Sequence, residues 1–223
     1  GMPLRSLNCR NNQIRSLEPL RRCTLKALNC SDNPLRSLEP LRGMPLTSIQ
    51  CSANLLTSLQ PLADAPLKQL SCHANYIKSL QPLNGRHLNA LLCGHNPLSA
   101  LDPFVEAPPD SFYFDCETLS DSYLEWALAR WKQQPATEIH ARQVEILLAI
   151  RRNNPDRLRA LAHRHNGHAY LLNPQFLLWE EACRQAERFG AHLTTISSHE
   201  ENEFISSLFP LGCWMWIGLR TQQ

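Results

Sequence analysis

The sequence predicts an α/β fold: a parallel β-sheet built from short repeats, then helices, then a smaller α+β segment. Cysteines and asparagines recur 21 residues apart, at Cys9, Cys30, Cys51, Cys72 and Cys93 and at Asn12, Asn33, Asn54, Asn75 and Asn96. After Ser120 the apolar spacing changes to three and four residues, which is typical of helices. The regular 21-residue spacing before Ser120 indicates stacked coils, that is, a solenoid.

Each repeat contains a short strand followed by a turn. In the second repeat, Leu25, Leu28 and Cys30 fit a strand whose apolar members point inward. Asn33 follows where the chain leaves the strand, and its amide can both donate to and accept from backbone groups there. One unit cannot bury its own apolar face, so we expect the units to stack into a parallel sheet on the concave face.

The repeated motif LxxLxCxxNx[LI]xxLxP[LF] resembles that of leucine-rich repeat proteins. Its Gly43-Met-Pro-Leu46 turn also resembles those of planctomycete-type bacterial repeat proteins. The resemblance implies a bacterial scaffold that binds a protein partner. Such arrays are often joined to kinase or other modules, so the regulatory part of a larger enzyme, such as a kinase, stays open as an alternative.

The five repeated cysteines have two interpretations. Strands about 4.8 Å apart bring cysteines within disulfide range, which would allow a disulfide or metal framework. Side chains on adjacent parallel strands point the same way, however, and the sequence has no CxxC pair. We therefore expect free thiols packed in the core.

The composition excludes several classes. The chain has 223 residues, 43% of them hydrophobic, and no apolar run approaches the ~20 residues of a membrane helix. A net charge of +2 does not indicate a nucleic-acid partner. Core thiols favour a reducing compartment, so we expect a cytoplasmic protein; an exported or cell-surface protein with buried thiols is the alternative.

The outward strand positions are the candidate binding site. The residues chosen there are Asn8, Arg10, Asn29, Gln50, Gln69, Ser71, His73, Leu92 and Tyr113. The third outward position of successive repeats, which includes Ser31, Ser52 and Gly94, is expected to be exposed as well. Because this face is small and polar, a solvated surface is the competing interpretation.

Charged columns also follow from the period. Two are basic (Arg5, Lys26 and Lys68; Arg15, Arg36 and Lys78) and one is acidic (Glu18, Glu39 and Asp102). Interleaved signs mostly serve solubility. An anionic partner is the more specific alternative.

The array is expected to occupy residues 1–118. A sixth, degenerate strand is predicted within Asp110–Cys116, where Phe112 and Phe114 would cover the core. Because Gly1 falls inside a repeat, the chain is expected to be cut from a longer protein; the alternative is that Gly1 is a tag remnant and Met2 coincides with the repeat.

Residues 119–165 are predicted to form a helical cap and linker. One helix carries a stripe from Tyr123 to Trp131, a second ends near Arg151, and a third begins at Asn154-Pro155. The His163–His168 stretch is expected to be a solvent-exposed linker rather than a metal site.

Residues 166–223 carry a second set of motifs: NGHAY, WEEA, GAHL, EENEF and WIGL. Their order resembles the first half of a C-type lectin-like domain. A capping box is predicted at Ser198–Glu201 and an apolar strand at Trp214–Leu219. The cysteine expected seven residues after Trp179 is Ala186 here, with Cys183 instead, so the usual disulfide is not expected.

The lectin-like resemblance implies carbohydrate binding as an alternative function, although the half that holds calcium and sugar lies outside this sequence. An unpaired Trp214–Leu219 strand would favour self-association. The sequence has no P-loop, GxGxxG, GxSxG or HExxH motif. We therefore predict a non-catalytic scaffold with no catalytic residue, metal or cofactor.

Overall fold

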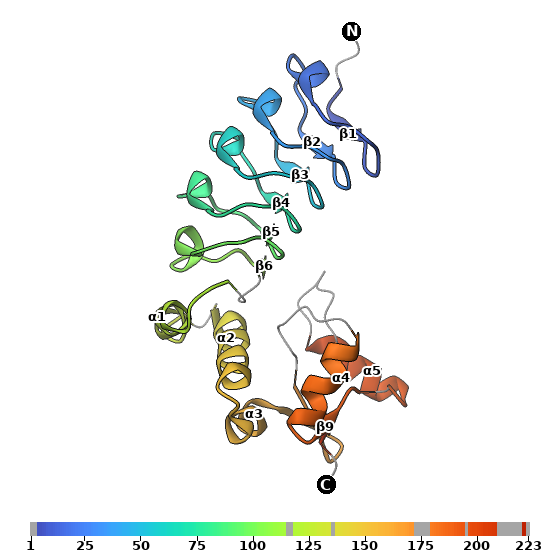
Figure 1. Cartoon of the computed structure of the whole chain (residues 1–223), viewed down its shortest axis with the longest axis vertical. Helices are drawn as coiled ribbons and strands as arrows, with labels where there is room; N and C mark the ends of the chain where they lie inside the picture. Colours follow the sequence, from blue (N-terminus) through green and yellow to red (C-terminus); the bar gives the residue numbers. More distant parts are fainter. Residues whose placement is uncertain are drawn as a thin grey trace. The chain divides into compact units, whose positions relative to one another are not determined.

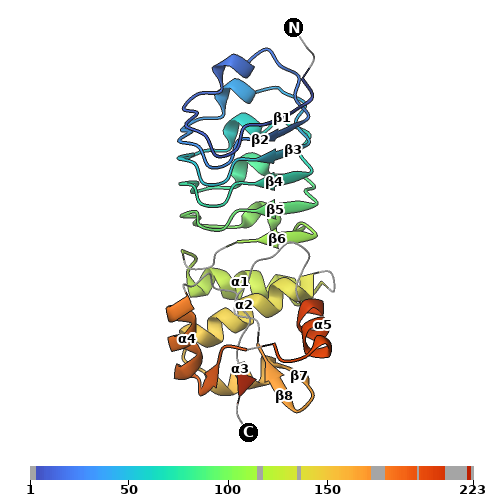
Figure 2. The same cartoon turned by 90° about the vertical axis from the view of Figure 1, so that its right-hand side faces the viewer.

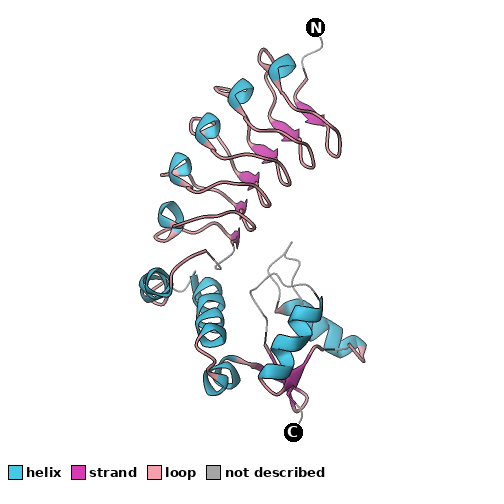
Figure 3. Cartoon of the chain, viewed as in Figure 1, coloured by secondary structure: helices cyan, strands magenta, loops and turns pink. Residues whose placement is uncertain are grey.

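The computed structural model describes residues 4–114, 118–134, 137–171, 179–194, 196–208 and 220–221. The chain divides into two compact units, an N-terminal unit (Gly1–Leu119) and a C-terminal unit (Ser120–Gln223). The fold is mixed α/β (Figure 3). Each unit is described by itself.

Six parallel strands form the sheet of the N-terminal unit, in the order β1-β2-β3-β4-β5-β6. They are β1 (Ser6–Asn8), β2 (Ala27–Asn29), β3 (Ser48–Gln50), β4 (Gln69–Ser71), β5 (Ala90–Leu92) and β6 (Ser111–Tyr113). Each strand pairs with the strand 21 residues along, as Leu28 does with Ile49. Figure 2 shows the six strands stacked in sequence order.

A short 3₁₀ helix follows each of the first five strands. These helices are η1 (Glu18–Leu20), η2 (Glu39–Leu41), η3 (Gln60–Leu62), η4 (Gln81–Leu83) and η5 (Asp102–Phe104), each with proline in its first turn. Proline has its φ preset near the helical value and lacks an N–H that would go unpaired there. Within this unit the strands lie along the inner edge of the curved stack and the 3₁₀ helices along its outer edge (Figure 1).

The buried asparagines bond to backbone groups of the turn, as predicted, and they also join neighbouring repeats. The Nδ2 of Asn54 donates to the carbonyl oxygens of Cys30, Cys51 and Ser52, and its Oδ1 accepts from the backbone N–H of Leu35. Asn33, Asn75 and Asn96 make the equivalent bonds one repeat apart. The asparagine column therefore supplies the hydrogen bonds that each turn needs in a region closed to water.

The turn preceding each asparagine contains a left-handed residue. These residues are Asn11, Asp32, Ala53, Ala74 and His95, with φ between 50° and 56°. This turn explains one wrong prediction: Ser31, Ser52 and Gly94 are buried, not exposed. The chain bends at the next residue, so these small groups lie against neighbouring repeats; the Ser31 hydroxyl accepts from the Ser52 N–H at 3.2 Å.

The repeated cysteines are free thiols in the core, as the packing interpretation predicted. Cys30, Cys51, Cys72 and Cys93 are buried, and Cys9 at the first strand is half-buried. Burial raises the pKa of Cys30 to about 12 and raises those of Cys51 and Cys72 well above the usual value. These thiols are therefore protonated and inert near neutral pH.

The predicted sixth strand is confirmed as β6. Phe112 packs against Phe104 and Phe114, with ring centroids 5.8 and 4.7 Å away, and all three rings are buried. Aromatic side chains thus replace the leucine and cysteine of the regular repeats at this end of the core.

Three helices begin the C-terminal unit: α1 (Asp121–Trp131), α2 (Glu138–Arg151) and α3 (Pro155–Leu161). Ser120 caps α1 and Asn154 caps α3, each side chain accepting a backbone N–H three residues on. Trp131 is fully buried. A small core joins α2 and α3 to Leu171.

The predicted linker at His163–His168 is wrong. β7 (His163–His165) and β8 (His168–Tyr170) form an antiparallel hairpin. Asn166 and Gly167 both have positive φ, 48° and 78°, which suits the tight turn of such a hairpin. The Asn-Gly dipeptide was the signal that the linker interpretation overlooked.

The rest of the C-terminal unit contains α4 (Trp179–Arg188), β9 (Ala191–His192), α5 (His199–Ser207) and β10 (Arg220–Thr221), which pairs with β9. The Ser198 hydroxyl accepts from the Glu201 N–H at 3.0 Å, which is one half of the predicted capping box. The Glu201 carboxylate accepts from the backbone N–H of Ser197 at 2.9 Å. The predicted strand Trp214–Leu219 lies outside the described residues.

Candidate functional site

The predicted binding residues come together on one surface. Six of them occupy a single row across the sheet, at register-paired positions of β1 to β6: Asn8, Asn29, Gln50, Ser71, Leu92 and Tyr113. Gln69 belongs to a second row that pairs it with Ser48 and Ala90. We call the outward side chains of these two rows the strand face.

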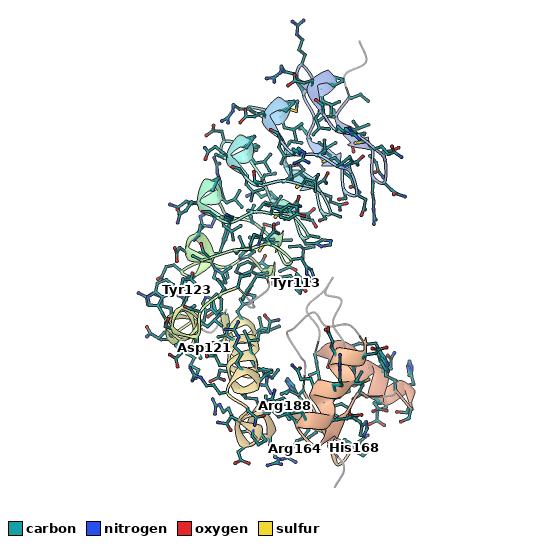
Figure 4. The ribbon with its side chains drawn as sticks, in the orientation of Figure 1. Tyr113, Asp121, Tyr123, Arg164, His168 and Arg188 are labelled. Atoms are coloured by element: carbon teal, nitrogen blue, oxygen red, sulfur yellow. The ribbon has the colours of Figure 1, made fainter. Side chains whose placement is uncertain are left out.

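The chemistry of the strand face changes along the sheet. The Asn8 row carries amides on β1 to β3, a hydroxyl on β4, then Leu92 on β5 and Tyr113 on β6. Leu92 and Tyr113 are half-buried, whereas Gln50 and Gln69 are exposed. Tyr113 is labelled in Figure 4. One end of the face therefore offers polar groups, and the other an aliphatic and an aromatic side chain.

Arg10 and His73 lie just beyond the strands, two residues after the Asn8 row. Arg10 lies in a shallow, open pocket of about 600 Å³, which is lined by Asn8, Arg10, Asn11 and Asp32. The Nε of Arg10 lies 2.7 Å from Oδ2 of Asp32. The sequence identified Asn8 and Arg10 but missed Asp32 and Asn11, because the αL turn that carries them was not anticipated.

The outward side chains of the strand face are small and mostly polar. Its members are amides, hydroxyls, alanines, one leucine and one tyrosine, and Arg10 lies nearby. Within the described ranges, no group of three His, Cys, Asp or Glu residues could hold a metal ion. No described helix is both long and apolar enough to cross a membrane.

The C-terminal unit contains a buried polar network that sequence reasoning did not find. The Tyr170 hydroxyl donates to Oε1 of Glu201 at 2.9 Å, while the backbone N–H and hydroxyl of Ser197 donate to Oε2. His165 stacks on Phe204, with centroids 4.2 Å apart. The network ties the β7–β8 hairpin to α5.

No protein-family model matches the chain. A curated relative is a C-type lectin-like protein, one of the subunits of the snaclec coagulation factor IX/factor X-binding protein of Gloydius halys, which is 38% identical over 66 residues. The alignment covers 26% of this chain and 43% of the relative. The chain thus spans less than half the length of that relative.

Proposed function

We propose that this chain is a non-catalytic protein-recognition scaffold. The N-terminal unit is a leucine-rich repeat solenoid whose strand face binds a protein partner, and residues 166–223 are the first half of a C-type lectin-like domain. The observation that carries the proposal is the register that aligns six predicted binding residues in one row of a parallel sheet.

The character of the strand face favours a protein partner. A row that begins with amides and ends with Leu92 and Tyr113 can hydrogen-bond a peptide backbone and pack against an apolar side chain. Tyr and Arg are enriched among the residues that dominate binding energies in protein interfaces. Tyr113 and Arg10 lie at opposite ends of the face.

The lectin-like relative agrees with this proposal. Its name describes binding to coagulation factors, which are proteins. The aligned share of the chain, 26%, also corresponds to the length of segment 166–223. Carbohydrate binding is a second candidate, which rests on the lectin-like similarity alone.

The test begins with selection of protein fragments from a phage-displayed library on the purified chain. The affinity of a selected, purified fragment is then measured against two double variants. Gln50→Arg with Gln69→Arg crowds the strand face, while Gln60→Arg with Gln81→Arg makes the same change on the outer η3 and η4 helices. All four glutamines are exposed, so both variants are expected to fold.

We expect the strand-face variant to lose at least about tenfold in affinity and the outer variant less than about twofold, as for central and rim positions of an interface. Equal losses in both variants would contradict the proposal. The proposal would also be contradicted if the selected fragments bound only to residues 120–223 of the chain. Selection of sugars from a glycan array, with no protein fragment retained, would favour the carbohydrate alternative.

A further inference from the structure

The charges of the N-terminal unit are concentrated at one end. Residues 4–42 contain eight Lys and Arg against three Asp and Glu, whereas residues 43–114 contain three against four. The first two repeats are therefore basic, and the remaining ones are close to neutral. A net charge of +2 for the whole chain conceals this asymmetry.

Most of these cations are not neutralised. Three of the eight form ion pairs: Arg10 with Asp32, Arg21 with Glu18, and Arg42 with Glu39. The other five are exposed and form no ion pair with any residue that the structure describes; they are Arg5, Arg15, Arg22, Lys26 and Arg36. An excess of exposed charges of one sign attracts oppositely charged partners and increases their rate of association.

Arg10 is the cation best placed to make a specific contact. Its side chain is 62% exposed, and Asp32 holds the guanidinium through Nε. Among the described residues, none accepts a hydrogen bond from its two Nη groups. A guanidinium fork of this kind matches a carboxylate with two parallel hydrogen bonds.

The other pocket residues define which anion fits. Oδ1 of Asn8 accepts from the backbone N–H of Arg10 at 3.1 Å, so the Nδ2 group of Asn8 is the part left to donate to a ligand. The Asp32 carboxylate belongs to the same lining, and its charge repels a dianionic phosphate more strongly than a singly charged carboxylate. The neighbouring amides of the Asn8 row are suited to a peptide backbone.

We propose that the pocket of Asn8, Arg10, Asn11 and Asp32 binds an Asp or Glu carboxylate of a protein partner, and that the surrounding basic repeats attract an acidic segment of that partner. This inference rests on the proposed function and names the partner's chemistry. It assigns Arg10 as the anchor at the polar end of the strand face.

The test uses a fluorescein-labelled eight-residue peptide with six glutamates, and its glutamine counterpart as probe control. Fluorescence anisotropy measures binding to the whole chain and to Arg10→Gln, Arg10→Lys and Lys78→Gln. Lys78 is the matched control, since it is an exposed cation of the fourth repeat without an ion pair to a described residue. Circular dichroism checks that each variant folds.

We expect saturable binding of the glutamate peptide that weakens between about 20 and about 200 mM salt, because added salt shortens the distance over which charges attract. Arg10→Gln should lose about tenfold in affinity, Arg10→Lys less, because an ammonium lacks the fork, and Lys78→Gln under about twofold. Inorganic phosphate should compete only weakly.

Four results would overturn the inference. They are no binding of the glutamate peptide at low salt, equal affinity for the glutamine peptide, equal losses of affinity in Arg10→Gln and Lys78→Gln, or displacement of the labelled peptide by an oligonucleotide or phosphate more readily than by unlabelled glutamate peptide. These failures are distinguishable from failure of the proposed function. If Gln50→Arg with Gln69→Arg still abolishes binding of a selected fragment while Arg10→Gln does not, the scaffold remains and the acidic partner is wrong.

Discussion

The two units of this chain differ in the hydrogen bonds that stabilise each of them internally. In the N-terminal unit, each buried asparagine bonds to the backbone of its own repeat and to that of the preceding repeat, and the pattern recurs every 21 residues. In the C-terminal unit, Glu201 accepts from Tyr170, 31 residues away, in a contact specific to that pair. The N-terminal unit distributes its hydrogen bonds over many equivalent sites, whereas the C-terminal unit concentrates several on one buried carboxylate, that of Glu201.

This difference predicts the largest effect for the centre of the asparagine column. Asn54→Ala removes four hydrogen bonds and leaves buried backbone groups unpaired, so we expect a loss of about 3–5 kcal/mol in unfolding free energy. Asn12→Ala, at the exposed first repeat, should cost about 1 kcal/mol or less. Urea unfolding monitored by circular dichroism measures both, and equal losses would contradict the column.

The second effect concerns the hydrogen bond from Tyr170 to Glu201. Tyr170→Phe removes a hydrogen bond to a buried carboxylate, and we expect it to cost about 2 kcal/mol, a typical value for bonds to charged groups. Calorimetry should show the C-terminal unit melting earlier while the N-terminal transition stays in place. Tyr76→Phe, at an exposed tyrosine of the N-terminal unit, is the matched control and should leave both transitions unchanged.

The third effect is a pH dependence confined to the N-terminal unit. Because burial raises the pKa of Cys30 to about 12, the folded state keeps a proton that the unfolded state releases near pH 9. Stability should therefore be unaffected by this thiol below about pH 9 and fall by about 1 kcal/mol per pH unit above it. Urea unfolding at increasing pH checks this, and Cys30→Ala should have the shallower slope; identical slopes would contradict the buried-thiol account.

The smallest effect is a stabilisation. Ala53 has φ 50°, a left-handed conformation that costs alanine more than glycine. Ala53→Gly should raise the unfolding free energy by about 0.5–1 kcal/mol, whereas Ala27→Gly within β2 should lower it by a similar amount. Urea unfolding measures both variants. If the two substitutions changed the unfolding free energy in the same direction, the left-handed turn at Ala53 would not be what decides the effect of glycine.

The same difference explains how far the sequence could be interpreted. The strands, the buried cysteines and the asparagine column follow from residues that recur at one spacing, because each repeat makes its contacts with an identical neighbour. Arg10 and Asp32, or Tyr170 and Glu201, meet only after the chain has folded, and no sequence period indicates them. The burial of Ser31 and the β7–β8 hairpin depended on local turn geometry that the apolar pattern does not encode.

The most direct test of recognition through the strand face is site-specific photocrosslinking to a purified fragment obtained by selection. A benzophenone amino acid replaces Gln69 on β4 in one protein and Gln81 on η4, in the same repeat, in the other. We predict that the Gln69 position crosslinks to the fragment and that the Gln81 position does not. Crosslinking from Gln81, with none from Gln69, would contradict the account.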